Sequence, residues 1–222
     1  MPKEKQLIAK VKLKGAPPQH KEALDLLIEE KSNTKFLGFW RVRTRNWYLS
    51  EKWRKRRNKQ ENTIWEAPIY YTQDGTERTV AKMESYLKNQ GYFNAQVVSK
   101  KRHKLIRRKA AIVKYKIKEN KQYVFNEISR NVEDYDIYVL LQNDRENSLL
   151  QKGIPFSSTA LTSERERVYK LLRENGYYSF SKSYVYFDLD STLNNYRVNV
   201  SLGVKNPGNY QRHRPFLIGK IH

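Results

Sequence analysis

YLKNQGYFNAQV (residues 86–97) reads as the end of a helix, a glycine, two aromatic residues and the start of a strand, and LLRENGYYSFSKSYV (residues 171–185) repeats that order. Gly91 and Gly176 are 85 residues apart (176 minus 91). Each glycine follows a helix, at the position that favours a left-handed backbone. The same offset relates one alternating apolar set to another: Val113, Tyr115 and Ile117 to Val198, Val200 and Leu202. We infer an internal repeat, whose turns are Gly91, Tyr92 and Phe93, and Gly176, Tyr177 and Tyr178.

The hydrophobic pattern predicts the same elements in both copies. Apolar residues alternate in strands and recur at helical spacing in helices. In the first copy we expect a strand at 7–13, helices at 20–31 and 77–90, and strands at 95–100 and 110–118. In the second we expect a strand at 122–131, helices at 132–142 and 160–175, and strands at 183–190 and 196–204. Ser163 and Glu166 have capping-box spacing, which would start the last helix a turn later.

This order predicts an α+β fold of two tandem β-α-α-β-β modules, each a three-stranded mixed sheet covered by two helices. We place the first module at 1–120, with a long basic and aromatic insertion at about 36–70, and the second at 121–206. RPFLIGKIH resembles QYVFNEISRN, the opening strand of the second module. Residues 207–222 are therefore expected to hold a linker and the first strand of a third repeat.

Composition limits what such modules can bind. The chain has 222 residues, 38% of them hydrophobic, and a formal charge of +21, which attracts an anionic partner. Since it has no cysteine, disulfides, thiolate zinc sites and cysteine nucleophiles are excluded. The sequence shows no apolar run long enough for a membrane helix and no secretory signal at its start.

VYFDLDSTL (residues 185–193) matches the DxDxT signature of haloacid-dehalogenase phosphotransferases. Those enzymes need a parallel sheet after the motif, and only 34 residues follow Asp188 (222 minus 188). We therefore expect Asp188 and Asp190 on the wet face of an amphipathic strand. His20, His103, His213 and His222 lack metal-ligand spacing. We predict no enzyme activity, no catalytic residue, no metal site and no cofactor.

Residues 35–60 carry the main competing signal. Basic residues are interleaved with tryptophans there and could grip phosphates while stacking bases: Trp40, Arg41, Arg43, Arg45, Trp47, Trp53, Arg54, Arg56 and Arg57. One alternative is therefore a nucleic-acid-binding protein. Contact with an anionic membrane surface fits the same residues, and so does a plain insertion pinned by its tryptophans.

The repeat resembles the polypeptide-transport-associated (POTRA) repeats of BamA-type and TamA-type outer-membrane assembly factors. The resemblance rests on the β-α-α-β-β order and on the helix-GY[FY]-strand turns. KSNTKFLGFW, PIYYTQDGTERTVAKMESYLKNQGYF and GIPFSSTALTSERERVYKLLRENGYYSF look like the lipoprotein-anchored branch of Bacteroidota. The chain departs from the full pattern, because it shows no signal peptide, no lipid-bearing cysteine and no barrel.

The resemblance implies a periplasmic, outer-membrane-associated scaffold preceding a C-terminal β-barrel of the same full-length protein. Its partners would be unfolded outer-membrane proteins and accessory assembly subunits. A small sheet also exposes unpaired backbone groups at its edges, where an extended client can add a strand. Because the first strand should pair with the last, we expect the second strand of each module at an edge. The predicted contact residues are Ala95, Gln96, Val97, Val98 and Ser99, and Lys182, Ser183, Tyr184, Val185 and Tyr186.

Overall fold

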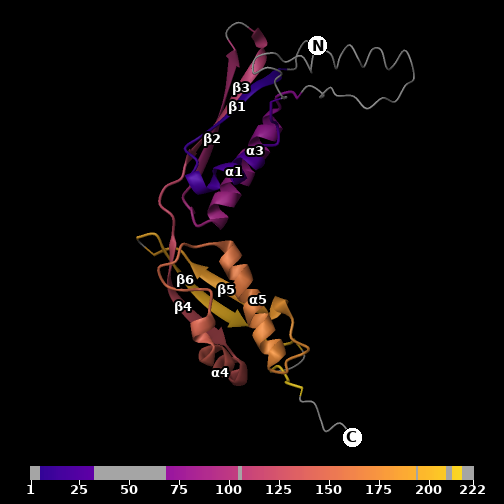
Figure 1. Cartoon of the computed structure of the whole chain (residues 1–222), viewed down its shortest axis with the longest axis vertical. Helices are drawn as coiled ribbons and strands as arrows, with labels where there is room; N and C mark the ends of the chain where they lie inside the picture. The colour runs from indigo at the N-terminus through magenta and orange to yellow at the C-terminus, as the bar shows by residue number, and fades with distance from the viewer. Residues whose placement is uncertain (1–5, 33–68, 105–106, 194, 209–211, 217–222) are drawn as a thin grey trace, which may run out of the picture. The chain divides into compact units, whose positions relative to one another are not determined.

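Two three-stranded sheets organise the chain in the computed structural model, which describes residues 6–32, 69–104, 107–193, 195–208 and 212–216 (Figure 1). One compact unit holds the first sheet, and the other holds the second sheet together with residues 87–94. The strand orders are β1-β3-β2 and β4-β6-β5. Each sheet therefore has the last strand of its unit at the centre and the second strand at an edge.

The elements follow one another in the same sequence in both units. The first unit contains β1 (Leu7–Lys14), a 3-10 turn (Pro18–His20), α1 (Lys21–Leu26), α3 (Gln73–Asn89) up to Tyr86, β2 (Gln96–Lys104) and β3 (Arg107–Lys118). The second contains β4 (Val124–Val132), α4 (Tyr135–Asn143), a 3-10 turn (Arg145–Asn147), α5 (Ser158–Glu174), a 3-10 turn (Lys182–Tyr184), β5 (Val185–Asp190) and β6 (Arg197–Val204). The predicted α+β fold with β-α-α-β-β modules is confirmed.

Each sheet is mixed, because its two ladders run in opposite senses. β1 pairs with β3 in parallel and β4 pairs with β6 in parallel, whereas β2 and β5 pair with the same central strands antiparallel. A parallel pair needs a crossover, which the two helices of each unit provide. The antiparallel pairs are hairpins.

Burial repeats with the sequence offset. Met83 and Val168, Leu87 and Leu172, and Tyr92 and Tyr177 are equivalent pairs, and all six side chains are buried. In the second unit the α4 and α5 residues Ile137, Leu141 and Leu172 share one core cluster with Val185 and Leu202 of the sheet. Both helices therefore cover the same face of the sheet, and the other face is open.

Both helices predicted in the first unit are present, but their ends differ from the predicted ones. α1 stops at Leu26 instead of continuing to Lys31, since Glu29 turns toward α3: its N–H donates to Thr79 Oγ1 at 3.3 Å. α3 starts at Gln73, one turn earlier than expected, because Thr72 Oγ1 accepts a hydrogen bond from Gly75 N at 3.0 Å. That bond satisfies a free amide of the first turn.

Three further expectations for the second unit are wrong. α5 starts at Ser158, not a turn later, because the side chain of Ser157 caps it by accepting from Thr159 N. The alternating apolar pattern of 183–190 and 196–204 predicts that Leu189 and Tyr196 face the core, yet 44% and 37% of their surface is exposed. Leu189 lies near the end of β5, and Tyr196 has φ +58° in the turn before β6. None of the described helices has the length and apolar character needed to cross a bilayer.

Gly91 and Gly176 lie in alike surroundings. Both have positive φ, +83° and +90°. Gly91 O accepts from Tyr123 N at 2.9 Å, and Gly176 O accepts from Phe216 N at 2.8 Å. A Cβ at either glycine would stand 2.9 Å from a backbone oxygen, that of Phe156 or Phe216. Glycine is therefore required twice over, by its dihedral angle and by the close approach of backbone.

Gly91→Ala should destabilise the second unit by about 3 kcal/mol, since alanine adds both left-handed strain and a clash. Gly153→Ala is the matched control, because Gly153 has φ +86° but nothing within 4 Å of its Cβ position. It should cost only about 1 kcal/mol. Urea unfolding gives both values, and equal losses would show that the close contact contributes nothing.

Candidate functional site

The four edges of the two sheets are not equally open. Near the start of β1, Ile8 N donates to Ile69 O at 3.0 Å and Tyr71 N donates to Gln6 O at 2.8 Å. At the start of β4, Phe125 N donates to Ile154 O and Phe156 N donates to Tyr123 O, both at 2.9 Å. The loop that precedes α3 thus pairs with the start of β1, and the loop that precedes α5 pairs with the start of β4. The edges at β2 and β5 have no such strand beside them in the described parts of the chain.

On β2, alternate residues direct their backbone groups away from the sheet. Val97 N donates to the carboxylate of Glu84 at 3.0 Å instead of to β3, so the Val97–Ile117 pair is not hydrogen-bonded. Antiparallel pairs alternate between bonded and non-bonded types. The N–H and C=O groups of Ser99 and Lys101 therefore face outward as well, and the register stays regular as far as His103.

The same analysis applies to β5. Lys205 N donates to Tyr184 O at 2.9 Å, which makes the next pair, Val185–Val204, the non-bonded type. Val185 O instead accepts from Arg165 Nε at 3.0 Å. By alternation, the backbone groups of Phe187 and Leu189 face away from β6.

In both units a helix side chain occupies the first outward-facing backbone group. Glu84 of α3 accepts from Val97 N, and Arg165 of α5 donates to Val185 O. The free stretches therefore begin two residues later, at Ser99 and at Phe187. Neither helix residue was predicted, because their contacts depend on how each helix lies over its sheet.

The two free edges carry opposite charge. β2 contains Lys100, Lys101 and Arg102 and no acidic residue, whereas β5 contains Asp188 and Asp190 and no basic residue. Both aspartates are exposed, as expected for the wet face of an amphipathic strand. Hydrogen bonds from the side chain and the N–H of Thr192 lower the pKa of Asp190. Among the described residues, no three His, Asp or Glu side chains are placed to share a metal ion.

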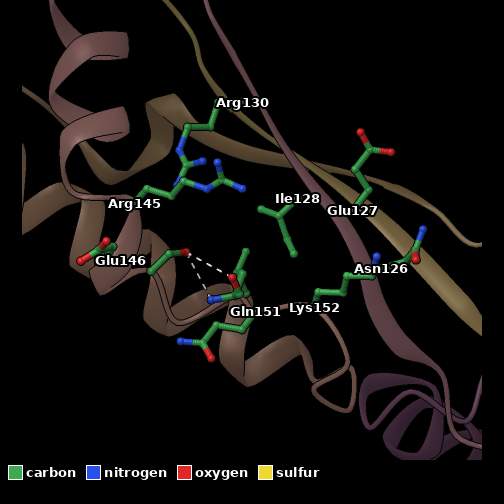
Figure 2. Close-up of a pocket in the computed structure, with 10 residues that line it drawn as sticks. Asn126, Glu127, Ile128, Arg130, Arg145, Glu146, Gln151 and Lys152 are labelled. Carbon is green, nitrogen blue, oxygen red and sulfur yellow. Dashed lines mark hydrogen bonds between the residues drawn. The ribbon is translucent and has the colours of Figure 1, made fainter.

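A polar cavity of about 820 Å³ adjoins the opposite edge of the second sheet, beside β4 (Figure 2). Ten residues line it: Asn126, Glu127, Ile128, Arg130, Arg145, Glu146, Ser148, Leu150, Gln151 and Lys152. Figure 2 shows the side chains of Arg130 and Arg145 close together at one end. Burial, and next the charge of Arg145, lower the pKa of Arg130. The cavity thus offers two guanidinium groups to a polar ligand and is distinct from the β5 edge.

A buried carboxylate fixes the wall of this cavity. Glu164 is fully buried in α5 and accepts from Ser148 Oγ at 2.9 Å and from Leu149 N at 2.8 Å. Arg167 donates to both Glu164 oxygens and also pairs with Asp144. Burial raises the pKa of Glu164, but these hydrogen bonds outweigh it and the pKa lies below its usual value. The ion pair was not predicted, since ERER (residues 164–167) on a helix normally marks a solvated face.

The structure places the predicted edge residues unevenly. Gln96, Val97, Val98 and Ser99 lie in β2 and Ala95 immediately precedes it, whereas only Val185 and Tyr186 of the second set lie in β5. Lys182, Ser183 and Tyr184 form a 3-10 turn, because the side chain of Ser181 accepts from Ser183 N, so their assignment to a strand was wrong. The Tyr186 ring lies over Gly203 on the open face.

The predicted turn residues of the repeat differ in burial. Tyr92 and Tyr177 are buried, Phe93 packs against the rings of Tyr123 and Phe156, and Tyr178 is half exposed.

Two other sequence-based expectations concern charged or polar segments. The basic and aromatic residues of 35–60 lie outside the described residues. His213 lies between two arginines in the sequence, which suggests a polar setting, but its ring is buried against Phe180 and Tyr184, with ring centroids 4.9 and 5.0 Å away.

Comparison with known proteins gives structural likenesses only. No protein-family model and no curated protein matches the chain. POTRA domains 3–5 of BamA from Haemophilus influenzae share 15% identity over 92% of this chain and 68% of that chain, with a TM-score of 0.43. BamA from Haemophilus ducreyi lacking POTRA domains 1–3 shares 14% identity over 94% of this chain and 29% of that chain, with a TM-score of 0.45. POTRA domains 1–2 of Omp85 from Anabaena share 9% identity over 90% and 96%, with a TM-score of 0.43.

The class of fold follows from the units themselves. Each has the β-α-α-β-β order, a three-stranded mixed sheet with the last strand central, and two helices over one face. Both units are therefore POTRA-like folds.

Glu164→Gln should destabilise the second unit by about 2 kcal/mol at neutral pH, because Arg167 loses a charged partner in a buried site. Glu166→Gln is the control in the same helix, since Glu166 forms an exposed pair with Lys182. It should cost well under about 1 kcal/mol.

The effect should also depend on pH. The pKa of Glu164 is lower in the folded chain than in the unfolded chain, so its contribution is complete above the usual carboxyl range and is lost as pH falls through the folded value. Urea unfolding of the wild type and Glu164→Gln should therefore converge in acid. A constant difference at all pH values would contradict the assigned ion pair.

Proposed function

We propose that the chain is a periplasmic polypeptide-binding scaffold of an outer-membrane protein assembly factor, and that extended clients add a strand to β2 and to β5. One observation carries the proposal: these two edges present outward-facing backbone groups, while the outer strands β1 and β4 are already paired at their starts. Main-chain hydrogen bonds bind with little regard to sequence. That property suits a receiver of many unfolded outer-membrane proteins.

The charged side chains beside each edge would favour clients of opposite charge. The basic β2 favours strands with acidic or neutral residues, and the acidic β5 favours basic ones. A single long client with both kinds of segment can then engage both edges, although each contact alone is weak. Strand addition of this kind needs no catalytic group, so we propose a scaffold and not an enzyme.

The finer parts of the proposal rest on sequence resemblance. They are docking of accessory subunits, membership of the lipoprotein-anchored Bacteroidota branch and a barrel elsewhere in the full-length protein. We also propose that residues 207–222 hold a linker and the first strand of a third repeat. The contact of Phe216 N with Gly176 O supports this, because Tyr123 N makes the same contact with Gly91 O just before β4.

Proline substitutions at outward-facing positions should test strand addition directly. Ser99→Pro with Leu189→Pro removes two amides that face away from the sheets, so the ladders stay intact. A strand added at either edge would lose one main-chain bond of about 1 kcal/mol, and affinity for an unfolded outer-membrane peptide should fall by roughly fivefold or more. Titration of a fluorescent peptide measures the change.

Ser99→Ala with Leu189→Ala is the matched control, since it changes the same side chains and keeps both amides. Its peptide affinity should equal that of the wild type, and circular dichroism should show that all variants are folded. Unchanged binding by the folded proline variant would refute strand addition at these edges.

A further inference from the structure

The open face of the first sheet is covered by cations. Eight side chains point away from the helices there: Lys10, Lys12, Lys14, Lys100, Arg102, Lys114, Lys116 and Lys118, which we call the lysine face. Seven of the eight are exposed, and Lys114 is half buried among the others. β1, β2 and β3 contain no acidic residue. Within the described parts of the chain, no salt bridge joins the lysine face to a carboxylate.

Strand register brings these charges directly opposite one another. Lys12 and Lys100 flank Lys114 in one row across the sheet, and Lys14 pairs with Lys116 in the next. Like charges at paired positions destabilise a sheet. The charge of Lys14 is the largest cause of the lowered pKa of Lys114. The face therefore costs the fold stability.

The repeat shows that the fold does not need these lysines. At the offset of 85 residues, Lys114 and Lys116 correspond to Asn199 and Ser201 on the open face of the second sheet. Ser129 pairs with Ser201 where Lys14 pairs with Lys116. The second sheet thus builds the same architecture with serine, asparagine and aspartate in these rows, and the cations of the first sheet need a separate explanation.

We propose that the lysine face docks on an anionic phospholipid surface. Charge complementarity is the argument, since each Lys or Arg near such a surface contributes about 1 kcal/mol. Lysine is a hydrated point charge without fixed bonding geometry, which suits a fluid layer of headgroups. Single-stranded nucleic acid would need aromatic platforms. β1 and β2 have no Phe, Tyr or Trp, and Tyr115 of β3 is buried.

This inference goes beyond polypeptide binding and does not rest on it. Strand addition uses the backbone along the margin of β2, whereas the lysine face uses side chains above the plane of the sheet. Either can fail without the other, because proline at Ser99 leaves all eight cations in place.

Vesicle binding by the whole chain tests the inference. The face variant carries Lys12→Ser, Lys14→Ser, Lys114→Asn and Lys116→Ser, and the last three copy residues of the second sheet. The control variant carries Lys21→Gln, Lys88→Gln, Lys152→Gln and Lys170→Gln, which removes the same charge at four exposed positions elsewhere. Sedimentation with vesicles of phosphatidylcholine plus phosphatidylglycerol, and of phosphatidylcholine alone, gives the partition coefficients.

We expect the wild type to bind only the anionic vesicles, and the face variant to bind them at least about tenfold more weakly. The control variant should lose about twofold. The face variant should also melt at the wild-type temperature or above it, since like-charge pairs are removed.

Equal losses in the two variants would overturn the proposal, because binding would then follow net charge alone. Unchanged binding by the face variant would overturn it too. So would a single-stranded RNA oligonucleotide that binds through the lysine face while anionic vesicles do not bind, since the occupant would then be nucleic acid.

Discussion

Parallel pairing of the first strand of each unit with the last strand sets the rest of the structure. It places β3 and β6 at the centre, and a parallel pair can close only through a crossover, which both helices of the unit supply. The second strand of each unit, β2 or β5, therefore lies at an edge of its sheet. The open edges, the covered face and the open face all follow from this one connection.

The sequence was sufficient for the architecture because its signals are redundant. Alternation in 110–118 and 196–204, helical spacing before Gly91 and Gly176, and one shared offset all indicate the same module. The ends of elements were harder to predict, because side-chain caps decide them. The side-chain cap of Ser157 sets the first residue of α5. The cap of Ser181 favours a 3-10 turn at Lys182–Tyr184, where strand residues were expected.

The candidate site was predicted only in outline. That β2 and β5 lie at edges follows from chain order, but which amides are free depends on register and on long side chains from the helices. Glu84 and Arg165 each take one backbone group, so the open stretch starts at Ser99 and Phe187 and not at Ala95 and Lys182. Glu164 was unpredictable for a related reason, because its burial depends on the loop at 148–150.

The two units share a fold but differ in charge, so one architecture presents two surfaces. The central claim is that extended polypeptides pair with β2 and β5, and residue-resolved amide exchange tests it most directly. On adding an unfolded outer-membrane peptide, exchange should slow at Ser99, Lys101, Phe187 and Leu189, whose amides face outward, and stay unchanged at Val98, Lys100 and Tyr186, which are already bonded in the ladders. Protection that ignores this alternation, or that appears only on the helices, would contradict the account.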